Sequence, residues 1–531
     1  LNTLFSSKII MIKYFFSIVL MSLLNASNCS TKKIVQKKPN IIYVLADDLG
    51  YGDISVYNKS SKISTPNIDQ LASEGIKFTD AHSSSSVCTP TRYGILTGRY
   101  NWRSRLKSGV TNGNSRALIL PSRTTVASIL QEKNYTTAFI GKWHLGWDWA
   151  LKNSAISKGR RLNAKDFNKI DFSKPIKNGP NDVGFNYAYG HSGSLDMAPY
   201  VYVENGLPTK IPDTITVNKD RYSKWRKGPT SSDFIHDDVT PNFFRKSFTY
   251  IREKAKEEKP FFLYLALPSP HTPILPTKEW QGKSGLNPYG DFVMMLDAYV
   301  GQLEKVIKEA GIEDNTIVIF TSDNGCSPGA NFKEMAKKGH HPSYMYRGNK
   351  ADIFEGGHRV PFIVKWPNEI DKGITSDEII CTTDLMATCA NLVGYSLQEN
   401  EGEDSYDMTP LFKQFKLDKP IREATIHHSI NGSFAIRKDD WKLIMCPDSG
   451  GWSFPRPTNK KAIDSLPKYQ LYHLKSDPGE TNNLYATNTE KVTELKTLLT
   501  KHIIEGRSTP GIPQKNDATK SKWKQIEFTK Q

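Results

Sequence analysis

Cysteine is scarce in this sequence, which has six in 531 residues. They are Cys29, Cys88, Cys326, Cys381, Cys389 and Cys446. Their wide spacing does not fit a disulfide framework, and no Cys-x-x-Cys pair indicates a zinc site. Cys88 stands out because it lies in "SSSSVCTPTRYGILTGRY" (83–100), where serine is otherwise used freely. The thiol of Cys88 is therefore expected to have a specific function.

Long blocks of lysine or arginine are also absent, although the formal net charge is +16. The positive residues are scattered, as in "KKIVQKKPN" and "TKSKWKQ". No nucleic-acid-binding signature accompanies them, so we expect no nucleic-acid partner. Two explanations of the charge stay open: a solvated basic surface, or a positive field that attracts an acidic polysaccharide.

The apolar run over residues 14–24 is too short to cross a bilayer as a mature helix. It follows Lys13 in "MIKYFFSIVLMSLLNASNCS", which fits a secretory signal peptide within residues 1–29. "NASNC" resembles a bacterial lipoprotein box with Cys29 as the lipidated residue, although Asn28 stands where Gly or Ala is usual. Lipidation and simple secretion stay open. Either one predicts an extracytoplasmic protein, in the periplasm, on the outer membrane or secreted, with a lipid anchor as its only membrane contact.

Buried strands and helices alternate from residue 39 onward. Continuous apolar runs predict strands at 40–48, 136–146, 260–273 and 315–325, and helical spacing predicts helices at 65–75 and 294–311. This alternation predicts an α/β domain over 39–420, with a large, mostly parallel sheet flanked by helices. Residues 150–260 look like insertions over that sheet. Alternating patterns at 432–446 and 469–477, and an amphipathic helix at 489–506, predict a small α+β subdomain over 421–531.

Each of the four predicted strands ends in polar side chains. In an open α/β sheet, ligands bind at the carboxyl ends of the strands, so we expect one shared site there. A single aspartate after a strand is more often a helix cap, but "ADDLGYGD" and "TSDNG" are two paired sets. The residues at these ends are Asp47, Asp48, Lys142, His144, His271, Asp323 and Asn324.

The carboxylate and amide groups in this set offer only oxygen ligands, which suit Ca²⁺ or Mg²⁺ rather than zinc. Ca²⁺ is favoured because it tolerates the irregular geometry that two loops provide. The alternative is an acidic cluster neutralised by Arg92, Lys142 and Lys350.

Cys88 is predicted to lie just before a short helix. Pro90 suits the first helical position and Gly98 ends the helix. Backbone N–H groups at a helix start favour an anion, and Arg92 can reach back to the same point. This environment is too polar for an ordinary buried cysteine.

"C-T-P-T-R" followed by "L-T-G-R" resembles the signature of the type I sulfatases, in the alkaline phosphatase superfamily. The resemblance extends from "PNIIYVLADDLGYGD" to "LYHLKSDPGETNNL" and includes "GKWHLG", "PHTP", "SDNG" and "RGNKADIFEGGHRVPFIVKWP". It implies an alkaline phosphatase-like fold. It also implies oxidation of Cys88 to Cα-formylglycine by a formylglycine-generating or an anaerobic sulfatase-maturing enzyme. The usual pattern is C-x-P-S-R, and this sequence has Thr91 in place of the serine.

The resemblance implies a role for each residue of the predicted site. The implied metal ligands are Asp47, Asp48, Asp323, Asn324 and the formylglycine at position 88. Arg92 and Lys142 stabilise the formylglycine and the sulfate, and His144 accepts a proton from the hydrate. The sulfate is bound by His271, Lys350 and Ser194, with Ser192 close by and His271 as the acid for the leaving alcohol.

The implied reaction uses the hydrate of the aldehyde. Metal and cationic side chains lower the pKa of one hydroxyl, which attacks sulfur in line while the substrate alcohol departs. The second hydroxyl then loses its proton, the aldehyde re-forms and sulfate leaves. A serine at this position could be sulfated but could not expel sulfate in this way.

"SGSLDMAPYVYVENG" and "GHHPSYMYRGNKADIFEGGHR" resemble bacterial carbohydrate sulfatases of the N-acetylgalactosamine-6-sulfatase type. The implied substrate is a sulfated oligo- or polysaccharide, either an algal polymer such as ulvan or carrageenan or an animal glycosaminoglycan. His340, His341 and Arg347 precede Lys350 and are candidates for sugar recognition, or they are simply loop surface.

Two other functions stay open at this point. One is a phosphodiester or phosphonate monoester hydrolase of the same superfamily. The other is an inactive glycan-binding protein built on the sulfatase fold, which the complete set of site residues disfavours. A two-zinc phosphatase needs more His and Asp ligands than these motifs provide.

Overall fold

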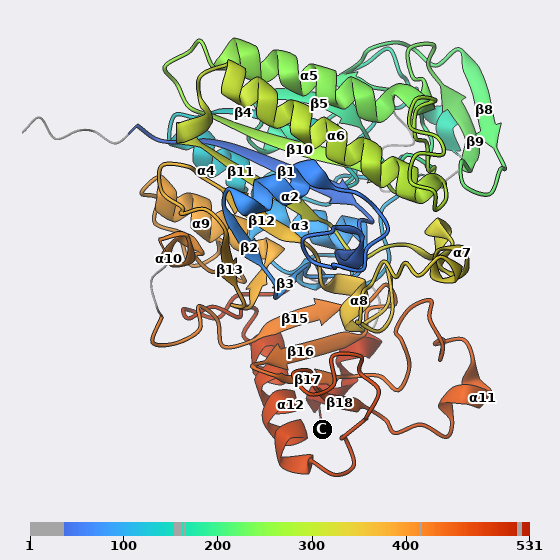
Figure 1. Ribbon diagram of the computed structural model, residues 1–531, viewed down its shortest axis with the longest axis vertical. Coiled ribbons are helices and arrows are strands. Elements are labelled where there is room, and N and C mark those ends of the chain that lie inside the picture. The colour runs from blue at the N-terminus through green and yellow to red at the C-terminus, as the bar shows by residue number, and fades with distance from the viewer. Residues whose placement is uncertain (1–36, 153–161, 163–165, 414–416, 518–522, 531) are drawn as a thin grey trace, which may run out of the picture. The chain divides into compact units, whose positions relative to one another are not determined.

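A ten-stranded mixed sheet forms the centre of the fold (Figure 1). The computed structural model describes residues 37–152, 162, 166–413, 417–517 and 523–530. The strands of the sheet are β1 (Asn40–Asp47), β2 (Ile76–Phe78), β4 (Thr136–Lys142), β5 (Tyr187–His191), β6 (Val203–Glu204), β7 (Leu207–Pro208), β10 (Phe261–Pro270), β11 (Thr316–Ser322), β12 (Phe362–Lys365) and β13 (Ile374–Ser376). Their order is β13-β2-β12-β11-β1-β10-β4-β5-β6-β7. The central run from β11 to β5 is parallel, which confirms the predicted mostly parallel sheet.

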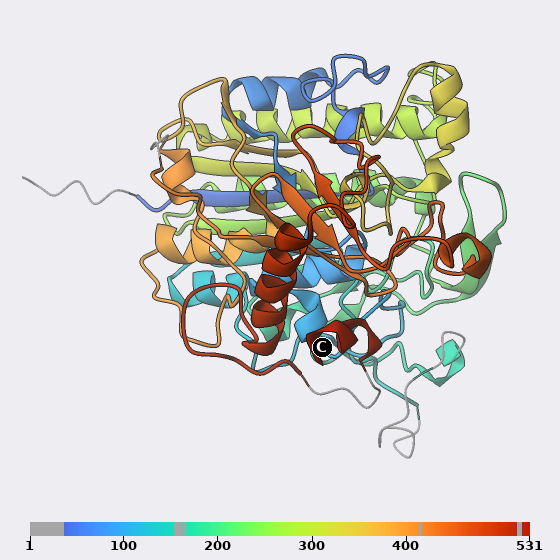
Figure 2. The ribbon, with the colours of Figure 1, turned by 90° about the horizontal axis from the view of Figure 1, so that it is seen from below.

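Helices cover both faces of this sheet (Figure 2). Residues 41, 43 and 45 of β1 face one layer, and residues 42, 44 and 46 face the other. Burial on both faces explains why these strands read as continuous apolar runs. The first layer contains α3 (Cys88–Thr97), α4 (Val126–Glu132) and α9 (Leu385–Leu392). The second contains α2 (Pro66–Ser73), α5 (Val239–Lys254) and α6 (Pro288–Glu309).

Three elements differ from the prediction. Helix α6 begins six residues earlier than expected, because the Asn287 side chain caps it by accepting a hydrogen bond from the Gly290 N–H. Helix α3 begins at Cys88 itself, so Pro90 is its third residue. Residues 150–260 are more than insertions, since they supply β5, β6 and β7 to the main sheet and α5 to one helical layer.

The C-terminal part contains the predicted small antiparallel sheet. Its four strands are β15 (Thr425–His428), β16 (Phe434–Lys438), β17 (Trp441–Ile444) and β18 (Gln470–His473). Helix α12 (Thr489–Ile504) packs on it through Leu495, Leu499 and Ile503. The predicted strand at 432–446 is the hairpin β16–β17, which turns at Asp439 (φ 53°). The described residues from Pro39 onward form one compact unit, so the boundary at residue 420 stays a prediction.

Several peripheral segments lie on the side where the parallel strands end (Figures 1 and 2). They are the hairpin of β8 (Thr214–Asn218) and β9 (Trp225–Thr230), helix α7 (Phe332–Lys337) and helix α11 (Lys460–Ile463). The short elements that remain are β3 (Ala81–His82), β14 (Ile380–Cys381), α8 (Glu355–His358) and α10 (Thr409–Phe412).

The predicted signal peptide and Cys29 lie outside the described residues. Among the helices within the described ranges, none combines the length and the apolar composition that crossing a membrane requires. The predicted localisation therefore stays a prediction.

Candidate active site

The carboxyl ends of neighbouring parallel strands bring the predicted polar residues together. Asp47 ends β1 and pairs with Pro270 of β10, while Ala46 pairs with Ser322 of β11. The residues that follow these strands therefore share one edge of the sheet. They are Asp48, His271, Asp323 and Asn324, with Lys142 at the end of β4.

Cys88 is the first residue of α3 and points its thiol into this cluster. Its Sγ atom lies 3.5 Å from Asp47 Oδ1 and 3.4 Å from Lys350 Nζ. The whole of α3 is buried. A cysteine whose thiol lies between a carboxylate and an ammonium group does not serve to fill an apolar core.

Three buried ion pairs shorter than 3 Å surround the thiol. The guanidinium of Arg92 also donates to the backbone carbonyl of Lys142, which fixes it across two strand ends. With pairing this close, the carboxylates and cations are held in place before any ligand binds. The pairs are Arg92–Asp323 at 2.8 Å, Lys142–Asp47 at 2.5 Å and Lys350–Asp48 at 2.6 Å.

His144 is held as a neutral base. Its backbone adopts a left-handed conformation (φ 53°), and its Nε2–H donates to the Thr111 carbonyl at 2.9 Å. Its Nδ1 atom is buried without a hydrogen-bond partner among the described residues. Burial, with Lys142 and Arg92 nearby, holds the pKa of His144 well below its usual range. The Nδ1 lone pair is therefore available to accept a proton.

Thr111 is a residue that the sequence did not reveal. Its carbonyl holds the His144 ring, and the hydroxyls of Thr89 and Thr111 each donate to the His144 carbonyl at 2.8 Å. A backbone carbonyl carries no signal of residue type, so sequence patterns could not identify it.

His271 stands at the solvent side of the cluster. Its Nδ1 bonds the Thr272 carbonyl and lies 3.4 Å from Ser194 Oγ, while its Nε2 lies 3.6 Å from Asp48 Oδ2. Its side chain is 13% exposed, whereas the side chains of Asp47 and Lys142 have no exposure. Nε2 thus has no backbone partner and belongs to a partly exposed ring.

The structure distinguishes the two candidate serines. Ser194 Oγ lies 3.3 Å from Lys142 Nζ and joins the cluster. The hydroxyl of Ser192 is buried without a hydrogen-bond partner in the described part of the chain. Ser194 is therefore the serine that the fold brings to the site.

The site fits a hard divalent cation. Ligand atoms of Asp47, Asp48, Cys88 and His271 all lie within 4.8 Å of one another. Asn324 Oδ1 is a buried acceptor that no described group satisfies. These carboxylate and amide oxygens are the ligands that Ca²⁺ and Mg²⁺ prefer.

The raised pKa of Asp323, another predicted ligand, supports this fit. Burial, and then the nearby carboxylate of Asp47, raise the pKa of Asp323 to about 7. A cation among these carboxylates relieves the repulsion between them.

Known proteins are similar to this chain over most of its length. The protein-family model described as Sulfatase matches residues 39–395. This chain belongs to the sulfatase family. It is 34% identical over 498 residues to an N-acetylgalactosamine-6-O-sulfatase of Bacteroides thetaiotaomicron, covering 87% of this chain and 93% of the relative. Human arylsulfatase A is 32% identical over 461 residues, covering 85% of this chain and 84% of the relative. The chain is therefore a sulfuric ester hydrolase.

Solved structures show the same sulfatase fold. One, from a study of glycosaminoglycan metabolism by Bacteroides thetaiotaomicron, has a TM-score of 0.75 and 32% identity, covering 88% of this chain and 99% of that chain. The structure named Ps i-CgsB shares the fold with a TM-score of 0.66 and 24% identity, covering 90% and 95%. The prediction of the family and of its fold is confirmed.

Thr91, which replaces the serine of the usual sulfatase pattern, keeps a hydroxyl that forms a hydrogen bond. Its hydroxyl donates to the Ser85 carbonyl at 2.9 Å, which ties α3 to the segment before Cys88. We expect Thr91→Ser to keep this hydrogen bond and to leave kcat/KM unchanged at equal maturation. Loss of one buried methyl group should cost about 1 kcal/mol of stability. Urea unfolding and an aryl sulfate assay check this. A large loss of activity at equal maturation would show that the methyl group positions the helix.

His340 has a structural role in this sulfatase. It is fully buried, and its Nε2 lies 2.8 Å from Asp53 Oδ1 while its Nδ1 accepts from the Lys62 N–H. This geometry contradicts the prediction that His340 binds substrate. His341 is exposed and stays a candidate.

Arg347 likewise holds the fold together. Its guanidinium donates to the Glu480 carbonyl at 2.8 Å and stacks on Phe354 at 3.9 Å. Arg347 is only half-buried, so its predicted substrate role stays a prediction. A loop sequence shows that side chains are polar, but not which of them turn inward.

Several histidines of the sulfatase are buried and neutral, which predicts acid lability. Burial lowers the pKa of His191 and His428 to about 3 and of His236 to about 4. It also holds the pKa of His358 and His427 well below the usual range.

These histidines take up protons on unfolding, so stability is full above their unfolded pKa of about 6.5 and is lost as pH falls below it. Each should cost about 1.4 kcal/mol at one pH unit below that value. Asp323 and Glu480, whose pKa values are raised to about 7, act in the opposite direction but are fewer. We expect Tm to fall steadily between pH 7.5 and 5.5. A flat profile would contradict the neutral state of these histidines.

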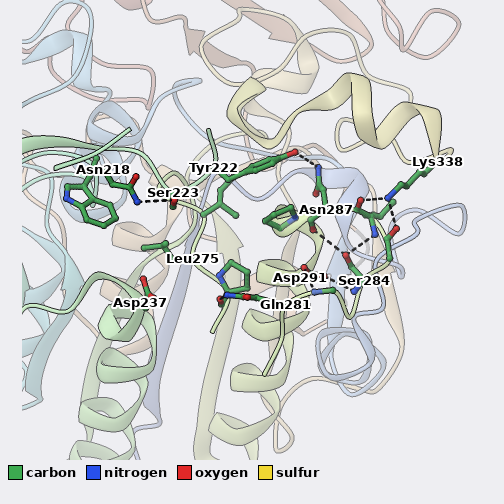
Figure 3. Close-up of a pocket in the computed structure, with 17 residues that line it drawn as sticks. Asn218, Tyr222, Ser223, Asp237, Leu275, Gln281, Ser284, Asn287, Asp291 and Lys338 are labelled. Atoms are coloured by element: carbon green, nitrogen blue, oxygen red, sulfur yellow. Dashed lines mark hydrogen bonds between the residues drawn. The ribbon is translucent and has the colours of Figure 1, made fainter. Parts of the chain in front are cut away.

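A pocket of about 810 Å³ lies between the β8–β9 hairpin and the start of α6 (Figure 3). Several of its polar side chains already form hydrogen bonds within the protein. Asn287 caps α6, Asp291 accepts from the Gly282 and Ser284 backbone, and Lys338 donates to the Gly285 carbonyl. The pocket therefore offers few free groups for recognising a sugar.

Proposed function

We propose that this sulfatase removes sulfate from a sulfated carbohydrate, with formylglycine at position 88 and Ca²⁺ at the ends of β1 and β11. The observation that carries the proposal is the position of Cys88 Sγ, between Asp47 and Lys350 at the start of a buried helix. The 34% identity to an N-acetylgalactosamine-6-O-sulfatase supports a glycosaminoglycan-type substrate. Ulvan and carrageenan are the second candidates.

The unmodified thiol suits this chemistry poorly. Burial raises the pKa of the Cys88 thiol, so little thiolate forms at neutral pH. Oxidation to formylglycine by a maturing enzyme supplies a hydrated aldehyde, and so an oxygen nucleophile, at the same position. The fold holds residue 88 beside Lys350 and Asp47.

The surrounding side chains bind the sulfate group and move protons. Lys142, Lys350 and Arg92 place positive charge where sulfate oxygens bind, and this stabilises charge that develops during transfer. His144 Nδ1 accepts a proton on the buried side. When the ring of His271 is protonated, its Nε2–H is placed to donate a proton to the departing alcohol, while its Nδ1–H stays on the Thr272 carbonyl.

Asp47, Asp48, Asp323 and Asn324 would hold Ca²⁺, which supplies positive charge to polarise bound oxygen atoms. We expect dialysis against a chelator to abolish sulfate release and to lower Tm, because the carboxylates lose a buried counter-charge. Ca²⁺ should restore both, and Mg²⁺ should do so less well, because it demands a stricter geometry. If metal analysis finds no divalent ion and the protein is still fully active, this assignment is contradicted.

The deciding experiment uses protein co-expressed with a sulfatase-maturing enzyme. Sulfate release is measured from N-acetylgalactosamine 6-sulfate, sulfated chondroitin disaccharides, and ulvan and carrageenan oligosaccharides. Paired aryl sulfate, phosphodiester and phosphonate esters test the alternative. Faster phosphorus ester cleavage would favour a phosphodiester or phosphonate hydrolase, and no turnover with a thiol at Cys88 would favour an inactive glycan-binding protein.

We also propose that the protein works outside the cytoplasm, supported by the signal-like segment at residues 11–30. Cys29→Ser should release the protein from membranes if Cys29 is lipidated. Unchanged membrane fractionation in that variant would exclude lipidation at this residue.

A further inference from the structure

A loop of the C-terminal part lies against the segment that carries Lys350. This loop, residues 450–456, is called the aromatic loop below. The backbone N–H groups of Trp452 and Ser453 donate to Asp352 Oδ1 at 2.7 and 2.9 Å. Asn349 Nδ2 donates to Ser453 Oγ at 2.7 Å. Residues on both sides of Lys350 are thus bonded to the aromatic loop, which fixes it beside the sulfate-binding lysine.

Glycine allows this close approach. A Cβ atom at Gly451 would lie 2.4 Å from the Ala351 carbonyl oxygen, so no larger residue fits without moving the backbone. Gly450 has a left-handed conformation (φ 62°), which glycine adopts without strain. The aromatic loop is therefore seated on the Lys350 segment and is not a loose surface loop.

Two large aromatic side chains project from this seated loop into solvent. The exposed fraction is 39% for Trp452 and 71% for Phe454. Exposed aromatic rings on a fixed loop next to the Lys350 segment are typical of a binding surface. The flat faces of such rings also suit the C–H faces of a sugar.

Positive charge accompanies the rings. Arg456 Nε donates to the Trp452 carbonyl at 2.7 Å, which places the guanidinium beside Trp452. Within the described residues, the structure records no ion pair for Arg456 or for Lys460 and Lys461 of α11, and all three side chains are exposed. The exposed guanidinium of Arg456, next to an exposed ring, is complementary to a sugar that carries an acidic group.

We propose that Trp452, Phe454 and Arg456 form a subsite for an anionic sugar residue adjacent to the one that loses its sulfate. The two rings stack on the sugar face, and Arg456 binds the carboxylate or sulfate of that residue. This inference rests on the proposed carbohydrate substrate. Figures 1 and 2 place α11, which follows the aromatic loop, on the side where the parallel strands end.

The test compares a small substrate with longer ones. We expect Trp452→Ala and Phe454→Ala to lower kcat/KM for a sulfated disaccharide about 5- to 10-fold, mainly through KM, because one aromatic contact is lost. Hydrolysis of an aryl sulfate and of a sulfated monosaccharide should stay unchanged. Ile504→Ala is the matched control, since Ile504 is 66% exposed on α12 and should affect no substrate.

Arg456→Gln identifies the acidic group. It should lower kcat/KM only for disaccharides whose second residue is charged, and added salt should reduce the difference. Disaccharides with a uronate, with a second sulfate and with a neutral second residue are compared. A loss for the uronate alone identifies a carboxylate ligand, and a loss for the doubly sulfated one identifies sulfate.

Two results would overturn the subsite. Equal losses on the aryl sulfate would show that the aromatic loop acts only by holding Lys350. Unchanged kinetics on every disaccharide would show that the rings touch no sugar.

Failure of the proposed function gives a different result: the wild-type protein then desulfates no carbohydrate at all. In that case calorimetric binding of the disaccharides to Cys88→Ala, with and without Trp452→Ala, decides whether the subsite exists. Equal or absent binding in both proteins would overturn it.

Discussion

Replacing Cys88 by serine should abolish repeated sulfate release while leaving the fold intact. The serine hydroxyl occupies the place of Sγ, between Asp47 and Lys350, so it can take up sulfate once. It has no second hydroxyl from which to expel that sulfate, so kcat should fall about 10⁴-fold or more. Turnover is measured with an aryl sulfate, and mass spectrometry should find sulfate on the peptide that contains residue 88.

Cys389→Ser is the control for this experiment. Cys389 lies on α9 in the core formed by α3, α4 and one face of the sheet. Its substitution should reduce stability modestly and leave kcat unchanged. Turnover by Cys88→Ser within tenfold of the wild type would show that position 88 does not supply the nucleophile.

Replacing Lys442 by methionine should cost about 3–5 kcal/mol of unfolding free energy, because buried Glu480 loses its recorded counter-ion and buried Glu355 keeps only arginines. Lys442 is fully buried on β17, and its Nζ lies 3.0 Å from Glu355 Oε1 and 2.9 Å from Glu480 Oε1. Glu355 begins α8, and the His358 carbonyl at the end of α8 accepts from the Ser83 N–H, just upstream of Cys88. Activity should therefore fall along with stability.

Lys438→Met is the matched control. Lys438 ends β16 and pairs with Glu423 and Glu494, but its side chain is 29% exposed. A partly exposed pair of this kind is worth at most about 1 kcal/mol. Urea unfolding followed by tryptophan fluorescence compares the two variants. Equal destabilisation would contradict the role assigned to the buried cluster.

The histidines beside Lys442 do not form a second metal site. Ligand atoms of His82, His358 and His427 lie within 4.8 Å of one another. However, the rings of His358 and His427 stack in parallel, with centroids 3.8 Å apart and an angle of 6°. Two imidazoles stacked in this way cannot both direct an in-plane lone pair at one ion. Lys442 Nζ already lies 3.0 Å from His358 Nε2.

The sequence was sufficient to predict the residues at the strand ends. Parallel strands buried on both faces read as apolar runs, and the polar residues after them must meet at one edge of the sheet. Asp47, Lys142 and Asp323 were found in this way. The geometry follows from the sheet alone, so no long-range contact had to be known.

Contacts between distant segments could not be predicted. His340 turns inward because Asp53, far away in the sequence, binds it, and Arg347 donates to the equally distant Glu480 carbonyl. The aromatic loop reaches Lys350 across about a hundred residues of sequence, through Asp352. Such contacts depend on how the C-terminal sheet packs, and no local pattern encodes that packing.

The most direct test of the central claim relates activity to the chemical state of residue 88. Wild-type protein is produced with different amounts of a maturing enzyme, and mass spectrometry gives the fraction of the Cys88 peptide that carries an aldehyde in place of the thiol. The specific rate of sulfate release should rise in proportion to that fraction and extrapolate to zero for pure thiol. A rate that is independent of the aldehyde fraction would contradict the assignment of Cys88 as the precursor of the nucleophile.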